Sequence, residues 1–323
     1  MNRIKLLTAL SIAGILPGLA GARPIELPGS ANLKNLIAGA DIIFRGKVDS
    51  VKDDIATITV ERAYKGASAD EKIQVTFDSA NQGCGQIIAN ERAIFLLKKA
   101  NGKRILIDCQ HGKIRTGAGK GKKAGSPEEL LAGDLESSVA SGTREERISA
   151  IQSLVALKRR DATSSIKEQI SSPDTEIKLT ARWALLKLGD ITQLDSLDQD
   201  LKANSKPSGV VIWSIGKAVS DVSDNKAVPA LERLSHSHNP QLMQASVRAL
   251  RALHSPSSAP RLVELLDSAD RDVAYDAMAG LDMIKNGEMS EIPSMTLFAK
   301  DSEKYIKQWK DWWQKAGKAK YGQ

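Results

Sequence analysis

Apolar and polar positions alternate with period two at residues 56–62 and 72–77, two of five short stretches in the first third of the chain that have the pattern of β-strands. These stretches carry β-branched and aromatic residues, and they cover residues 41–48, 56–62, 72–77, 92–97 and 103–107. Clusters of Gly, Asn, Asp and Lys separate them, so the pattern predicts β-strands joined by turns. Because closure removes exposed strand edges, five strands within about 70 residues favour a small closed barrel. A short helix is expected at residues 32–38.

From residue 126 onward the apolar spacing becomes helical and repeats along the chain. Five segments end in equivalent apolar residues, namely Leu157, Leu188, Val219, Leu253 and Ile284. The intervals between them are 31, 31, 34 and 31 residues. Such a period predicts a solenoid, in which each helix pair hides its apolar face against its neighbours.

A second amphipathic helix is expected in each repeat, before or after the breakers that separate the units. These second helices are predicted at residues 162–170, 194–201, 227–234 and 259–266. The breakers are SPD at 172–174, SKP at 205–207, NP at 239–240 and SAD at 268–270. They place Ser, Asp or Asn where a helix N-cap is wanted and Pro near a first turn.

Two of these segments resemble HEAT repeats of the short bacterial kind, as found in phycobilin-lyase-type repeats. The segments are KLTARWAL at 178–185 and SVRALRAL at 246–253. The resemblance implies an α-solenoid over residues 127–323 whose surface binds protein partners. It implies no particular activity, and a tetrapyrrole lyase would require an intracellular setting.

The predicted barrel, residues 23–110, resembles the N-terminal domain of tissue inhibitors of metalloproteinases, an OB-like five-stranded barrel of the netrin-module type. ADIIFRGK at 40–47, AYKG at 63–66, Cys84-Gly85 and Cys109 carry this TIMP-like resemblance. It implies metalloprotease inhibition as an alternative function. Those inhibitors chelate zinc through an N-terminal Cys-x-Cys, and residues 23–40 contain no Cys. The inhibitory residues therefore have no counterpart here.

The first 22 residues have the pattern of a secretory signal peptide. Arg3 and Lys5 precede an apolar stretch at 6–16, and AGA at 20–22 is a small-x-small cleavage site. No Cys follows the apolar stretch, so a lipoprotein anchor is not expected. We therefore expect a periplasmic or secreted protein that starts at Arg23 and has no stable membrane insertion after cleavage.

Export changes the expectation for the two cysteines, Cys84 and Cys109. In an oxidising compartment they are expected to form a disulfide that stabilises the domain by about 3 kcal/mol. A reactive or metal-binding pair is the alternative, although no His or CxxC lies at ligand spacing.

The chain has 46 basic and 39 acidic residues and a net charge of +7, which falls to +5 after loss of the signal peptide. In an exported protein this points away from nucleic acid and toward an anionic envelope polymer or an acidic protein. Residues 111–126, rich in Gly and Lys, are expected to form a linker.

Two groups are candidate interaction surfaces: the basic residues Arg45, Lys47 and Arg62, and the C-terminal tryptophans Trp309, Trp312 and Trp313. The tryptophans, on an expected closing helix at 302–317, could equally seal the last repeat.

We find no catalytic constellation in the sequence. There is no GxSxG elbow, and the carboxylates fall on solvent faces of the expected helices. His236, His238 and His254 could approach one another and hold zinc, but their spacing matches no ligand signature. The chain is therefore predicted to be an exported, non-enzymatic scaffold without cofactor, which binds protein partners of the cell envelope through its repeats.

Overall fold

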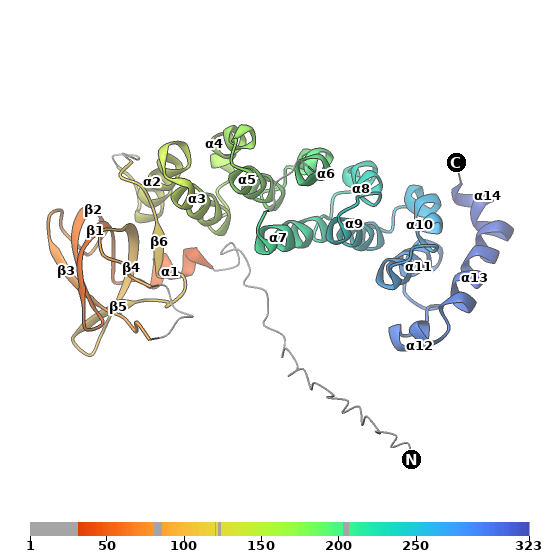
Figure 1. Cartoon of the computed structure of the whole chain (residues 1–323), viewed down its shortest axis with the longest axis horizontal. Helices are drawn as coiled ribbons and strands as arrows, with labels where there is room; N and C mark the ends of the chain where they lie inside the picture. The colour runs from red at the N-terminus through yellow and green to blue at the C-terminus, as the bar shows by residue number, and fades with distance from the viewer. Residues whose placement is uncertain (1–31, 81–85, 120, 122–123, 203–206, 323) are drawn as a thin grey trace, which may run out of the picture.

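The structure is a computed structural model that describes residues 32–80, 86–119, 121, 124–202 and 207–322. It consists of a β-barrel followed by a row of paired helices (Figure 1). This confirms the predicted two-part fold, an OB-like barrel and a HEAT-like α-solenoid. The predicted signal peptide lies outside the described residues. None of the described helices combines the length and the apolar character that crossing a bilayer requires.

The barrel is built from six strands: β1 (Ile42–Lys52), β2 (Ile55–Lys65), β3 (Lys72–Thr76), β4 (Arg92–Ala100), β5 (Lys103–Leu106) and β6 (Lys113–Arg115). Five of them close in the order β1-β2-β3-β5-β4, with β4 returning to β1. The closing pairs are antiparallel except β3 with β5, which run parallel and meet at Thr76 and Ile105. Strand β6 adds to β4 and buries Ile114. It lies within the segment predicted to be a linker.

Strand β1 buries side chains on both faces, because the barrel is covered on one side by helices. Phe44 points into the barrel, where its ring stacks on Phe95 with 5.4 Å between centroids. Its neighbour Ile43 joins Ile94 and Leu96 of β4 in the core shared with the helical part. A strand buried on both faces has a continuous apolar run, which explains the sequences of β1 and β4.

The helices alternate between short and long members along the chain. After α1 (Leu33–Gly39) come α2 (Pro127–Ser141), α3 (Arg144–Ala156), α4 (Thr163–Glu168), α5 (Thr175–Lys187), α6 (Leu194–Lys202), α7 (Gly209–Ser220), α8 (Val228–Leu234), α9 (Pro240–Leu253), α10 (Ala259–Leu265) and α11 (Arg271–Asn286). Figure 1 shows two rows: α3, α5, α7, α9 and α11 form the long-helix row, and α4, α6, α8 and α10 form the short-helix row.

The repeat period arises from burial of equivalent side chains in successive long helices. Leu157 and Val219 are fully buried, Leu188 and Leu253 nearly so, and Ile284 packs against the same core. The predicted breakers supply the N-caps: the side chains of Asp174, Asn239 and Asp270 accept hydrogen bonds from the first turns of α5, α9 and α11. Each long helix thus begins at its capping residue and buries its apolar face against its neighbours.

The C-terminal end of the solenoid is closed by α12 (Met295–Lys300), α13 (Ser302–Trp312), a π-helical turn (Trp313–Gly317) and α14 (Lys318–Tyr321). Phe298 is fully buried and packs edge-on against Tyr275 of α11 at 5.4 Å between ring centroids. Trp309 and Trp313 are also buried in the shared core. These segments cover the apolar face that α11 would otherwise expose, as terminal repeats must.

Candidate functional site

Asp134 of α2 is a fully buried carboxylate at the junction between barrel and solenoid. Arg45 of β1 donates to it at 2.8 Å, and Arg62 and Tyr64 of β2 also donate to it. Burial and the neighbouring Asp134 charge raise the pKa of Tyr64 far above its ordinary value, so its hydroxyl stays a donor. A buried charge is tolerated when it is paired and hydrogen-bonded. The cluster therefore fastens the two parts of the molecule.

The segment after β6 docks on the same helix. The backbone N–H of Gly121 donates to Asp134 at 2.9 Å, and that of Gly117 donates to the Ser138 hydroxyl at 3.1 Å. A Cβ on Gly121 would lie 2.5 Å from the Asp134 backbone nitrogen, so glycine permits this close approach. Part of the predicted linker thus lies against the fold.

The three basic residues proposed as an interaction surface have different environments. Arg45 is buried and Arg62 is mostly buried, and both bind Asp134 inside the molecule. Lys47, on β1 between the buried Gly46 and Val48, is partly exposed. The two guanidinium groups are thus engaged in the junction, which sequence spacing alone does not reveal.

A groove of about 360 Å³ lies between two long helices, α7 and α9. Its lining combines Trp213, Lys217 and Asp221 of α7 with Gln244 and Arg248 of α9. Where the helices approach, the lining is small: Gly216 and Ala245. The groove therefore offers an aromatic wall, both charge signs and amide groups.

Ion pairs between successive long helices hold the groove in shape. Lys187 of α5 reaches Asp221 at the end of α7 at 3.3 Å. On the other side, Arg248 and Arg251 of α9 donate to Asp276 of α11 at 3.1 and 2.6 Å. Burial raises the pKa of Asp276, although both arginines favour its charged form. These contacts cross repeat boundaries and set the spacing of the row.

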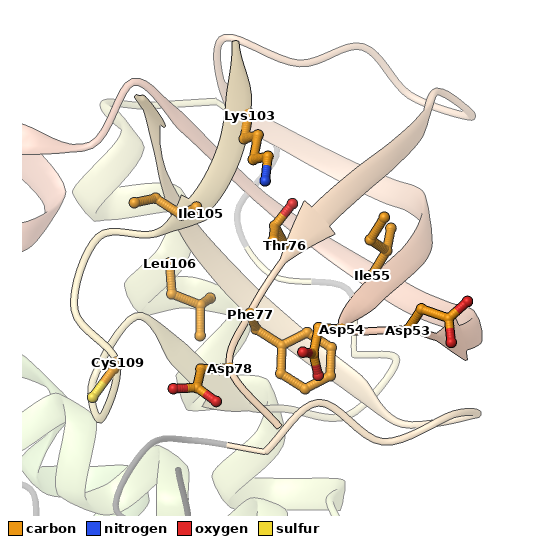
Figure 2. A pocket seen from close by; sticks show the side chains of 10 residues that line it. All are labelled: Asp53, Asp54, Ile55, Thr76, Phe77, Asp78, Lys103, Ile105, Leu106 and Cys109. Carbon is orange, nitrogen blue, oxygen red and sulfur yellow. The ribbon is translucent and has the colours of Figure 1, made fainter. Parts of the chain in front are cut away.

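A second hollow, of about 540 Å³, lies on the barrel where β3 and β5 diverge beyond their Thr76–Ile105 contact. Figure 2 shows its lining side chains. The apolar members are Ile55, Phe77, Ile105 and Leu106, and the polar ones are Asp53, Asp54, Thr76, Asp78, Lys103 and Cys109. We call this hollow the barrel pocket. The sequence pattern does not reveal this pocket, because its lining comes from the β1–β2 turn and from two strands that are distant in sequence.

The predicted tryptophan surface lies mainly inside the terminal cap. Trp309 and Trp313 are buried, and Trp312 is partly exposed between Trp309 and Tyr321. The Lys285 ammonium lies 5.5 Å from the Trp309 ring and 5.8 Å from the Trp312 ring. This is the sealing arrangement that the sequence left open as an alternative.

Two further sequence predictions concern metal and disulfide chemistry. Within the part of the chain that the structure describes, no three His, Cys, Asp or Glu side chains come together as a metal site requires. His236 and His238 are exposed and lie between α8 and α9. Cys84 lies outside the described residues, and the Cys84–Cys109 disulfide stays a prediction.

Comparison with known proteins agrees with the repeat assignment. The family model for HEAT repeats matches residues 201–282, which include α7 to α10 and most of α11. A crystal structure of an engineered protein has a TM-score of 0.36 and 19% sequence identity, covering 50% of this chain and 82% of that one. That likeness is too low to add to the argument. No curated protein matches the chain. The resemblance of the barrel to metalloproteinase inhibitors stays a prediction from its motifs.

Proposed function

We propose that the protein is an exported, non-enzymatic scaffold of the cell envelope that binds a protein partner along its long-helix row. The observation that carries this proposal is the groove between α7 and α9, which lies within the HEAT-repeat match. HEAT repeats are typical of protein-interaction scaffolds, because stacked helices present an extended surface. Trp and Arg, both present in the groove, are the residues enriched at interface hot spots.

The chemistry of the groove suits a protein segment better than a small molecule. Its polar lining and its open position on the helix row leave a ligand largely solvated, whereas small-molecule sites enclose most of their ligand. Gln244 supplies an amide group beside Trp213, and Lys217 and Asp221 supply both charge signs. These features support binding of an extended or helical segment of another protein.

Site-specific crosslinking in cells tests this function. A photo-crosslinking amino acid at position 244, in the groove, is expected to capture a defined protein. The same group at the exposed position 226, in the turn that precedes α8, is the control. The Trp213→Ala variant should reduce the adduct at position 244. Equal labelling at both positions, or a yield unaffected by Trp213→Ala, would contradict the assignment of the groove.

Export belongs to the same proposal and has its own test. Protein purified from the periplasm or the medium should begin at Arg23 and gain mass on reduction of the Cys84–Cys109 disulfide. Terminal sequencing and intact-mass measurement check both points. A cell-associated chain that retains residues 1–22 would exclude cleavage, and an unchanged mass on reduction would exclude the disulfide.

A further inference from the structure

We propose that the barrel pocket is a second binding site, which takes a protein segment presenting a Lys or Arg side chain next to an apolar one. The site lies on β2, β3 and β5 and the β1–β2 turn, outside the helix groove assigned above. It would give the scaffold two independent attachment points.

The pocket has an apolar floor that is partly exposed among the residues that the structure describes. Ile55 is 40% exposed, and Phe77, Ile105 and Leu106 are partly exposed. Phe77 and Leu106 also contact the barrel core, which fixes the floor in place. Exposed apolar side chains that gather in one hollow are typical of binding sites, whereas scattered ones are ordinary. The floor therefore provides burial for an apolar side chain.

The rim of the pocket is acidic, although the chain as a whole carries a net charge of +7. Among the described residues that line the pocket, Asp53, Asp54 and Asp78 are acidic, and Lys103 is basic. Figure 2 shows Asp53, Asp54 and Phe77 together on one side, with the Lys103 amine directed toward Thr76. A local excess of carboxylates attracts a cation and disfavours an acidic ligand.

Backbone geometry holds these carboxylates where they are. Asp53 and Asp54 both have left-handed backbone conformations, with φ of 47° and 61°, which Asp tolerates better than most residues. Asp54 also accepts a hydrogen bond from the Ser79 backbone N–H at 3.2 Å, and Asp78 accepts one from the Ala80 N–H at 3.1 Å. The carboxylates of Asp54 and Asp78 are therefore held at the edge of the floor, beside the exposed carboxylate of Asp53.

The openness of the pocket favours a protein segment over a free amine. Asp53, Asp78 and Lys103 at its rim are exposed, so a small molecule would keep much of its surface in water. A site for a small molecule buries most of its ligand, although the volume of such a site can be similar to that of this pocket. A side chain delivered by a peptide needs no such enclosure, because the rest of the segment contacts the rim.

Peptide selection on the full mature chain, residues 23–323, tests the proposal. A phage library of random dodecapeptides is expected to yield sequences with Lys or Arg beside Leu, Ile, Met or Phe. Binding of the best synthetic peptide is then measured by fluorescence polarisation. The double variant Asp53→Asn with Asp78→Asn should weaken it at least about tenfold, because two attractive charges are lost. Ile55→Ser should also weaken peptide binding, because it replaces an apolar side chain of the pocket floor with a polar one.

Matched controls separate the site from general charge effects. Asp70→Asn removes an exposed carboxylate from another left-handed turn, outside the pocket, and should change affinity by less than about twofold. Thermal unfolding checks that each variant is folded. Selection of no peptide family, selection of peptides without a cation, or unchanged binding by the double variant would each overturn the proposal. So would octylamine that competes with an affinity equal to that of the peptide, because the ligand would then be a free amine.

Discussion

At the residue scale, the carboxylate of Asp134 combines complete burial with several hydrogen-bond donors. It binds two guanidinium groups, the hydroxyl of Tyr64 and the backbone N–H of Gly121, all within a buried site. Replacing one partner leaves the others desolvated without compensation, which costs more than the pair itself contributes. Asp134 is therefore expected to govern how firmly barrel and solenoid are joined.

We predict that Asp134→Ala lowers the free energy of unfolding of the barrel–helix junction by about 3–5 kcal/mol, because it removes the acceptor shared by Arg45, Arg62 and Tyr64 and leaves Arg45 only Glu61, at 3.6 Å, as a carboxylate partner. Urea denaturation monitored by near-UV circular dichroism measures the loss. Glu128→Ala is the matched control on the same helix. Its pair with Lys34, 3.4 Å apart, is exposed, so this variant should cost less than about 1 kcal/mol. Equal costs for the two variants would show that burial does not set the strength of the junction.

At the element scale, α5 combines an N-cap with an ion pair to the preceding repeat. Asp174 caps α5 by accepting from the Ile177 N–H at 3.1 Å, and Arg144 of α3 donates to it at 2.8 Å. Burial alone would raise the pKa of Asp174, but the Ile177 hydrogen bond and the Arg144 guanidinium hold it below its usual value. The charged form of Asp174 is therefore the stabilising one.

This lowered pKa gives a pH-dependent prediction. A carboxyl group whose pKa is lower in the folded state stabilises the fold above its ordinary pKa of 3.8, and this stabilisation is lost as pH falls through the folded-state value. Asp174→Ala should therefore cost about 1 kcal/mol at pH 6, and the difference from wild type should shrink at pH 3. Urea titrations at both pH values measure this, with Glu168→Gln in the exposed part of α4 as control. A cost that is the same at both pH values would contradict an ionised cap.

The elements were largely predictable from sequence because their signals are local. Short runs of β-branched and aromatic residues between turn clusters mark β1 to β5, and the N-caps Asp174, Asn239 and Asp270 mark where three of the long helices begin. Strand β6 was missed because it is short and lies in a segment rich in Gly and Lys. The stability of this strand comes from pairing with β4 and from burial of Ile114, and both are tertiary effects.

The candidate sites were less predictable, because each depends on contacts between distant residues. Arg45 and Asp134 are 89 positions apart, and nothing in their local sequence marks them as partners. From the sequence alone, both would be taken for solvent-facing charges. Only the docking of the barrel on α2 brings them together in a buried site. The barrel pocket likewise joins residues near 54, 77 and 105 that meet through the β3–β5 contact. A pattern read along the chain carries no information on such pairings.

At the scale of the whole molecule, the fold is a row in which each unit contacts its neighbours, with the barrel at one end and the tryptophan cap at the other (Figure 1). In such a row, stability is a sum of local terms and interface terms. A defect at one end should therefore destabilise that end first and leave the far end protected. The apolar core is continuous from Leu33 to Trp313, but each part of it is formed by repeats that are neighbours in the row.

Trp309→Ala tests this view, because Trp309 is buried between the cap and α11. Truncation of a buried Trp typically costs about 3–5 kcal/mol, here borne by the C-terminal unit. Hydrogen exchange should become faster in α11 and α13 and stay unchanged in α2, whereas Asp134→Ala should give the opposite distribution. Trp312→Phe, at the partly exposed neighbour, is the control and should change little. If either variant accelerated exchange uniformly from β1 to α13, barrel and solenoid would unfold as one cooperative unit, and the two binding sites proposed here would not be independent of each other.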